Sequence, residues 1–260
     1  MKKYFLKNKN AVILSVVSLC IMWAVWIIAY YAVGNDYIIP SFKDTFVSFF
    51  KCLTGGEFWI AFAFTLLRTL GSFLISFLLA AACCALSSLS KIFKGLLNPL
   101  IVILRTLPTL AVILILLIWT NVTVAPIIVT VLLLFPVTYS QFLAAVEGID
   151  ADVLEMAKMY NVSKRDRLLK IYLPMSAPAV FSQIGANVSL GLKVMISAEV
   201  LSNTYKSLGG MMQNARVFLE MPRLAALTLV AVFSGLLLEF AFAQFKRINS
   251  KWRKTSDDID

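Results

Sequence analysis

The sequence predicts an all-α membrane protein with six transmembrane helices, and both its composition and its hydropathy pattern support this class. Of the 260 residues, 60% are hydrophobic and only 15% are charged, and the mean hydropathy is +0.85. Soluble domains are nearer half apolar and a quarter charged. The apolar residues form blocks of about 20 residues, the length of a helix that crosses a bilayer. We therefore expect a single membrane domain over residues 1–260.

The composition also excludes several kinds of chemistry. The chain has no histidine, which removes Ser-His-Asp and Cys-His nucleophiles, imidazole-bound zinc and histidine proton relays. Its four cysteines, with Cys83 and Cys84 adjacent, show neither a disulfide framework nor metal-ligand spacing. No G-x-x-x-x-G-K-[ST] phosphate loop occurs. We expect this chain to bind no metal and no ATP or other cofactor.

The first apolar block, residues 11–33, follows a basic start in the manner of a signal peptide. It is longer than the 7 to 15 apolar residues of a signal peptide, so an uncleaved first span is predicted. Aromatic and apolar residues then recur at i, i+4, i+7, i+8 and i+11, which predicts an amphipathic helix in the membrane interface. These residues are Phe42, Phe46, Phe49, Phe50 and Leu53.

The other five spans are predicted from apolar blocks and from prolines. Pro126 suits the first turn of a helix. Pro108 and Pro136 are expected to kink the third and fourth spans, and the charged tail from residue 246 is expected to fray. The spans are expected at about residues 59–88, 100–119, 126–146, 176–200 and 223–245.

Lysine and arginine accumulate on the cytoplasmic side of membrane proteins, so their placement orients the spans. With the N-terminus inside, the cytoplasmic segments hold 17 of the 24 basic residues, including Arg105, and the outer segments hold five. Arg68 and Lys193 lie inside predicted spans. We expect a multi-pass protein of the bacterial cytoplasmic membrane, with both termini and the segment 147–175 in the cytoplasm.

The polar segment between the fourth and fifth spans predicts a helical hairpin over residues 150–174. Asp150 or Asp152 can cap its first helix. Asn161 follows that helix and tolerates a left-handed backbone better than most residues. Four residues of the first helix share one apolar face at i, i+3, i+4 and i+7. They are Val153, Met156, Ala157 and Tyr160.

The second helix of the hairpin is expected to start at Ser163, with Asp166 as a capping-box partner, and to end at Pro174. On spacing alone, the hairpin fits equally well an amphipathic loop that lies on the lipid surface. DNA binding is disfavoured, because a recognition helix tethered at the bilayer would have to reach a groove.

The same segment resembles the EAA loop of permeases from binding-protein-dependent ABC importers. The pattern stands here as Glu155-Met156-Ala157, Asn161 and Ile171-Tyr172-Leu173-Pro174. At Met156 and Asn161 this chain departs from the Ala and Gly that are usual in the family. The resemblance covers about residues 59–245 and is closest to the branch that imports nitrate, sulfonates, taurine and some vitamin precursors. It is carried further by Leu67-Arg68, Asn98-Pro99, Arg105-Thr106-Leu107-Pro108, Ala198-Glu199 and Leu208-Gly209.

The resemblance implies the type I ABC importer permease fold and a transport subunit without catalysis of its own. It also implies two ATP-binding subunits that hold ATP and Mg, a second permease copy that is identical or a paralogue, and an extracytoplasmic solute-binding protein. Nucleic acid is not an expected partner. The cargo would be a small solute such as a sulfonate, nitrate or a vitamin precursor. The residues expected to contact the ATPase are Val153, Glu155, Met156, Ala157, Tyr160, Asn161, Arg165, Leu173 and Pro174.

Small and polar residues line one face of the fifth predicted span, for which helix packing and a translocation pathway are two open interpretations. Lys193 favours the pathway, since an ionisable residue within a span usually faces a cavity or a partner. It could instead snorkel or pair with Glu199. Arg68 fits a pathway for an anion and a structural ion pair equally well. The candidate pathway residues are Ser182, Gln183, Asn187, Ser189, Lys193 and Arg68.

A self-sufficient secondary transporter or channel is the alternative function. It would need acidic residues near the midplane or broken helices in paired repeats. No Asp or Glu lies centrally in the first five predicted spans, and Glu239 lies near the cytoplasmic end of the sixth. A membrane-embedded enzyme is weaker still, because histidine and a carboxylate cluster are missing from the sequence.

Overall fold

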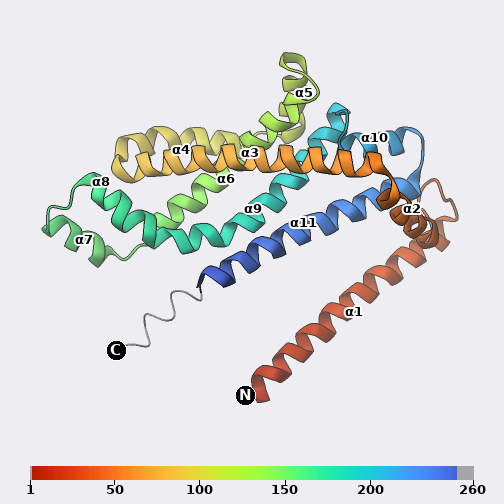
Figure 1. The fold of residues 1–260 in the computed structure, drawn as a ribbon, viewed down its shortest axis with the longest axis horizontal. Helices are drawn as coiled ribbons and strands as arrows, with labels where there is room; N and C mark the ends of the chain where they lie inside the picture. The colour runs from red at the N-terminus through yellow and green to blue at the C-terminus, as the bar shows by residue number, and fades with distance from the viewer. Residues whose placement is uncertain (1, 251–260) are drawn as a thin grey trace.

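The computed structural model describes residues 2–250, and every regular element within them is a helix. Four long helices lie side by side and form the body of the molecule (Figure 1). They are α3 (Gly56–Leu89), α6 (Val124–Glu147), α9 (Leu173–Ser202) and α11 (Met221–Ser250). Each contains one of the spans predicted from hydropathy, which confirms the all-α class.

Helix α1 (Lys2–Val33) contains the first predicted span and runs away from the bundle at an angle (Figure 1). It is anchored at the chain turn that follows it, where the indole nitrogen of Trp26 donates to the carbonyl of Pro40 at 3.2 Å. The described apolar part of this helix, Cys20–Val33, is shorter than a full crossing. The helix is therefore confirmed, and its crossing of the bilayer stays a prediction.

Helix α2 (Phe42–Thr54) is the predicted amphipathic helix. Ser41 caps it by accepting a hydrogen bond from the backbone nitrogen of Asp44 at 3.1 Å. Its aromatic stripe divides between two environments, because Phe49 packs into the core next to α11 whereas Phe46 and Phe50 are exposed. No membrane is present, so the position of α2 at the interface stays a prediction.

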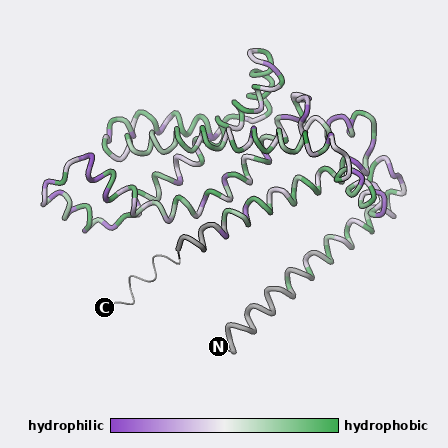
Figure 2. The backbone as a smooth tube through the Cα atoms, viewed as in Figure 1, coloured by the Kyte–Doolittle hydropathy of each residue, from purple (hydrophilic) through white to green (hydrophobic). Residues whose placement is uncertain are grey.

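Within the residues that the structure describes, four helical runs are long and apolar enough to cross a membrane. They are Gly56–Leu89, Val124–Glu147, Lys164–Ser202 and Met221–Phe242. A bent pair of helices would make a fifth if it forms one span. Figure 2 shows the hydrophobic residues along the long helices and the hydrophilic ones gathered near their ends. The count of six spans therefore stays a prediction.

The third span, expected over residues 100–119 with a kink at Pro108, is instead broken. Helix α4 (Lys91–Thr106) and helix α5 (Thr109–Trp119) meet at 96°. Leu107, which precedes the proline, is extended with φ −63° and ψ 128°. Proline disfavours the helical conformation in the residue before it, so the helix ends here and does not merely bend.

The early start of α4 also separates Arg105 from Lys91 and Lys94, with which it was grouped by charge. This residue lies 14 positions after Lys91, so it is about 21 Å along the helix from the end where α4 begins. Lys94 stays at that end, where it forms an ion pair with Glu147 at the end of α6. Lys94 and Arg105 therefore lie toward opposite ends of α4, and the side of the membrane on which Arg105 lies stays a prediction.

Helices α3 and α6 approach closely because small polar residues face the contact. Ser72 donates to the carbonyl of Ile127 at 3.4 Å, and Ser76 donates to that of Val131 at 3.3 Å. Small residues let membrane helices come near each other and satisfy their own hydroxyls on the backbone. The stripe continues along α3 through further buried residues, which are Thr65, Thr69 and Ala80.

Two ends of the bundle differ in what they carry. Helix α7 (Ala151–Met159) projects beyond the bundle at one end, toward which α11 runs and from which α4 starts (Figure 1). Helices α2 and α10 (Leu208–Val217) lie at the opposite end. If the bundle crosses a bilayer, the hairpin and the two ends of the described chain share one side, as the basic residues predict.

Gly185 provides a test of the packing between α9 and α11. A Cβ atom at this position would lie 3.0 Å from the carbonyl oxygen of Glu239 and 3.2 Å from Cβ of Phe242. We expect Gly185→Leu to force the helices apart at a cost of about 1–3 kcal/mol. The thermal midpoint in detergent should fall by several degrees. Ala186→Leu, at the exposed neighbouring position, should leave it unchanged, and equal midpoints for the two variants would contradict this packing.

Candidate functional site

The hairpin between α6 and α9 is closed by its own polar side chains. Asp150 caps α7 by accepting from the backbone nitrogen of Asp152 at 3.0 Å. Asn161 has φ +52°, the left-handed conformation predicted for the turn. Ser163 accepts from the backbone nitrogen of Asp166 at 3.1 Å, and its hydroxyl donates to the Asp166 carboxylate at 2.7 Å. The predicted caps are thus confirmed.

The apolar face expected on α7 is divided by burial. Ala157 is only 4% exposed and Val153 is half-buried, so these two residues face the chain itself. Met156, Met159 and Tyr160 are exposed, with fractions of 52%, 81% and 82%. The expectation that Ala157 offers its side chain to a partner is therefore wrong. The surface that a partner can reach consists of the two methionines and the tyrosine, with Glu155 exposed beside them.

The second part of the hairpin continues into α9 without a break, and Pro174 does not end it. Helix α8 (Lys164–Asp166) is followed by the π-helix η1 (Arg167–Tyr172) and then directly by α9. Proline in a helix removes one hydrogen bond and its ring crowds the carbonyl four residues earlier. The wider π turn just before Pro174 accommodates this, so the helix runs on.

Charges on this segment are partly neutralised within it. Lys170 forms an ion pair with Asp166 at 2.7 Å. This lysine and the Ser163 hydroxyl hold the pKa of the Asp166 carboxyl below its usual range. Lys164 and Arg165 are exposed beside the pair. Lys164 and Arg165 therefore leave basic charge exposed on the hairpin.

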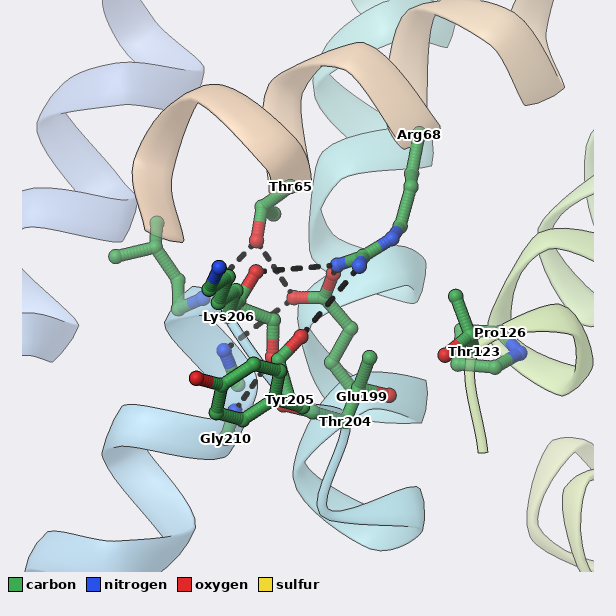
Figure 3. Close-up of polar contacts among 12 residues, drawn as sticks. Thr65, Arg68, Thr123, Pro126, Glu199, Thr204, Tyr205, Lys206 and Gly210 are labelled. Carbon is green, nitrogen blue, oxygen red and sulfur yellow. Dashed lines mark hydrogen bonds and ion pairs between the residues drawn. The ribbon is translucent and has the colours of Figure 1, made fainter. Parts of the chain in front are cut away.

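At the opposite end of the bundle, a buried carboxylate joins three helices (Figure 3). Glu199 on α9 is fully buried and forms an ion pair with Arg68 on α3 at 3.0 Å. Thr65, one turn earlier on α3, donates its hydroxyl to the other carboxylate oxygen at 2.8 Å. The backbone nitrogen of Gly209, in the first turn of α10, donates to that same oxygen at 3.3 Å. We call these residues the Glu199 centre.

The first turn of α10 is pressed against α9, which explains the paired glycines there. A Cβ atom at Gly209 would lie 2.3 Å from Cβ of Glu199, and one at Gly210 would lie 2.2 Å from the carbonyl oxygen of Thr204. The backbone nitrogen of Leu208 also donates to the Thr65 hydroxyl at 2.9 Å. Only glycine allows the helix start to reach the carboxylate, whose charge is favourable at a helix N-terminus.

Of the two interpretations of Arg68, its contacts favour the structural ion pair. Its guanidinium also donates to the carbonyls of Lys206 and Tyr205 at 3.4 and 3.5 Å, and its side chain is only 12% exposed. The carboxylate of Glu199 is therefore paired with Arg68 and not with Lys193. The arginine fastens the loop before α10 to α3.

The candidate pathway residues of α9 fall on two different faces. Asn187 is buried and exchanges two hydrogen bonds with Gln141 on α6, at 2.6 and 3.2 Å. Ser189 is buried as well and lies where a Cβ on Gly235 of α11 would meet it at 3.2 Å. These two residues pack the bundle. Ser182, Gln183 and Lys193 are exposed on the other face.

Lys193 stands out on this exposed face. Within the described part of the chain no carboxylate lies in ion-pair distance of it. It precedes the end of α9 at Ser202 by nine residues, or about 14 Å. A charge at such depth is costly in lipid and usually faces a partner or water. We call the exposed residues Ser182, Ala186, Leu190, Lys193 and Ser197 the outer face of α9.

Comparison with known proteins identifies the family. The model of the binding-protein-dependent transport system inner membrane component matches residues 72–254, which is most of the chain. The chain belongs to this family. It is a transmembrane permease of a binding-protein-dependent ABC transporter. The recognition made from the EAA-like segment is thus confirmed at the level of the family.

Two relatives of the permease have names that include a solute. The aliphatic sulfonates transport permease protein SsuC of Escherichia coli strain K12 is 28% identical over 235 residues, which are 88% of each chain. The taurine transport system permease protein TauC of the same strain is 26% identical over 165 residues, 63% of this chain and 60% of that protein.

Solved structures resemble the permease in fold. One, an amino acid ABC transporter with histidines, aligns with a TM-score of 0.62 at 16% identity over 74% of this chain and 93% of that one. The other, an alginate ABC transporter with its periplasmic protein bound to an alginate pentasaccharide, aligns with a TM-score of 0.63 at 14% identity over 94% and 96%. These likenesses confirm the importer permease fold that the resemblance implied.

Sequence reasoning missed two residues that the permease uses to hold its helices together. Thr65 and Gln141 are polar residues inside apolar blocks, and each meets a polar partner more than 40 residues away in the sequence. A polar residue within a span was the available signal, because such a group requires a partner in lipid. The spacing of residues along the sequence does not indicate which residue is the partner.

The Glu199 centre can be tested by removing one charge or both. We expect Arg68→Met to destabilise the permease by about 3–5 kcal/mol, because it leaves a buried carboxylate unpaired. The double variant Arg68→Met/Glu199→Gln should recover most of this loss, since the amide still accepts from Thr65 and Gly209. Thermal unfolding in detergent measures both. A single variant as stable as wild type would contradict a desolvated ion pair.

Proposed function

We propose that this permease is the membrane-spanning subunit of an ATP-driven importer for a small anionic solute of the sulfonate type. Two permease copies, identical or paralogous, would enclose the pathway, with two ATP-binding subunits that hydrolyse ATP with Mg and one extracytoplasmic solute-binding protein. The chain would lie in a bacterial cytoplasmic membrane with both termini and the hairpin in the cytoplasm. It would bind no cofactor itself.

The observation that carries this proposal is the hairpin. It projects beyond the bundle and exposes Met156, Met159 and Tyr160, an apolar surface that water does not favour. Flexible methionines suit docking in a groove, and the exposed Lys164 and Arg165 beside them provide charge complementarity. Because the hairpin continues into α9, a partner that moves α7 would also move the helix that carries Lys193.

The outer face of α9 supports the pathway and the class of cargo. Small residues along this face leave room, and Lys193 offers a cation that no described carboxylate neutralises. An anionic group such as a sulfonate fits such a site. The names of the sulfonate and taurine relatives point to the same chemistry. Asn187, Ser189 and Arg68 are left out of this pathway because their contacts lie within the bundle.

A self-sufficient secondary transporter remains the alternative, and one reconstitution separates the two. Uptake into liposomes should require the ATPase, ATP and the substrate-loaded binding protein. Uptake driven by an ion gradient without the ATPase would overturn the proposal.

The hairpin is tested by placing a charge on its exposed apolar surface. We expect Tyr160→Asp to reduce co-purification of the ATP-binding subunit at least tenfold, because the charge would have to be desolvated in the docking groove. Val217→Asp is the matched control, an exposed apolar residue of a short helix at the opposite end of the bundle. Normal association of the Tyr160 variant would contradict docking at α7.

Lys193 is tested by removing its charge while keeping its length. We expect Lys193→Met to lower ATP-dependent uptake of a radiolabelled sulfonate at least tenfold, and Lys193→Arg to restore much of it. Association with the ATPase should be unchanged in both, since Lys193 is remote from the hairpin. Full uptake by Lys193→Met would exclude the lysine from anion recognition.

A further inference from the structure

A groove at the hairpin end of the bundle is not used by the proposed function. It has a volume of about 240 Å³ and lies between α3, α6, η1 and the start of α9. The groove is left open because it is lined in part by the small residues Ala81, Ala85 and Ala177, where larger side chains would fill the space. The exposed Leu173 and Phe181 form part of its walls, so the groove is open to the surroundings of the bundle.

The interior of the groove accepts only an apolar ligand. Its two serine hydroxyls are already engaged, since Ser88 donates to the carbonyl of Cys84 at 2.7 Å and Ser176 donates to that of Tyr172 at 2.6 Å. Phe142 and other apolar side chains make up most of the remaining wall. Apart from the hydroxyl of Tyr172 and the thiol of Cys84, this wall offers no partner to a polar group that leaves water.

The dimensions of the groove match one hydrocarbon chain of one leaflet. Along α3 its lining runs from Ser88 to Phe77, eleven residues or about 17 Å. This is close to half of the roughly 30 Å hydrocarbon core.

The hairpin end of the groove is basic. From Ser163 to Tyr172 the chain carries four basic residues and one acidic residue, Asp166, which is taken by Lys170. Arg167 directly precedes Leu168 and lies one π turn before Tyr172, and both of these residues line the groove. Arg167 is only half-buried and forms no ion pair in the described part of the chain. An arginine placed there fits a phosphate group.

We propose that this groove binds one acyl chain of an anionic phospholipid from the cytoplasmic leaflet, with the lipid phosphate at Arg167. The inference rests on the proposed orientation, in which the hairpin is cytoplasmic. Basic residues at the inner ends of membrane helices attract anionic lipids. The bound lipid contacts α3 and also η1, the link between the hairpin and α9. It therefore stabilises the position from which the hairpin meets its partner.

Native mass spectrometry of the purified, delipidated transporter complex tests the proposal. The probes are phosphatidylglycerol and phosphatidylcholine with identical dioleoyl chains. We expect one phosphatidylglycerol per permease chain to be retained more strongly than phosphatidylcholine. Ala85→Phe should fill the groove and lower retention at least tenfold, whereas Leu79→Phe, exposed on the same helix but outside the groove, should not.

The headgroup contact is tested separately with Arg167→Gln, which should weaken retention of phosphatidylglycerol about fivefold. Retention of phosphatidylcholine should fall less, because the choline cation already compensates the charge of its phosphate. Lys164→Gln, exposed nearby in the hairpin, is the control. Equal retention by Ala85→Phe and Leu79→Phe, or no effect of Arg167→Gln, would overturn the proposal. All variants are compared at equal monodispersity in size-exclusion chromatography.

The lipid proposal and the importer proposal are tested by different measurements. Lipid retention requires neither ATP nor cargo, so a chain that fails to transport still reports on the groove. A thiol at Met159→Cys, in a chain whose four native cysteines are replaced by serine, tests the orientation on its own when it is labelled in intact cells by a membrane-impermeant reagent. Labelling from outside would place the hairpin and the groove in the other leaflet and overturn the lipid assignment.

Discussion

The buried carboxylate of Glu199 is the constraint on which the arrangement of the helices depends. A charge inside a membrane domain is tolerated only when it is paired and hydrogen-bonded. Arg68, Thr65 and the backbone of Gly209 meet this requirement, and they come from α3 and from the start of α10. These donors fix the relative positions of three helices at one end of the bundle. The small-residue contact of α3 with α6 then extends this fixed region along the bundle.

Helix α9 connects this fixed end with the hairpin and uses its two faces differently. The inner face is held by hydrogen bonds and close contacts, as at Asn187 and Gly185. The outer face keeps small residues and Lys193 exposed. A helix of 30 residues is about 45 Å long, so a displacement at the hairpin is transmitted as a tilt or rotation about the Glu199 centre. In the proposed importer, such a tilt or rotation of α9 would change the exposure of Lys193 when the partner moves the hairpin.

Hydropathy was sufficient to predict the long helices, because each of α3, α6, α9 and α11 contains a long and mainly apolar block. Local rules were sufficient for the hairpin caps, since Asn161 and Ser163 act on residues within a few positions. The failures concern contacts distant in sequence. The partner of Arg68 and the burial of Asn187 depend on helices more than 40 residues away in the sequence. The direction in which Ala157 faces depends on how the hairpin folds against the rest of the chain. Spacing along one helix cannot decide which face meets its neighbours.

Two prolines show why the hairpin can act as one body with α9. Pro108 follows an extended Leu107, and the chain turns by 96° between two separate helices. Pro174 follows a π-helical turn, which widens the backbone ahead of the ring and preserves the helical path. The same residue type therefore breaks one helix and leaves another continuous, depending on the conformation before it. Had Pro174 ended its helix as spacing indicates, a flexible joint would separate the hairpin from α9 and absorb any motion before it reached Lys193.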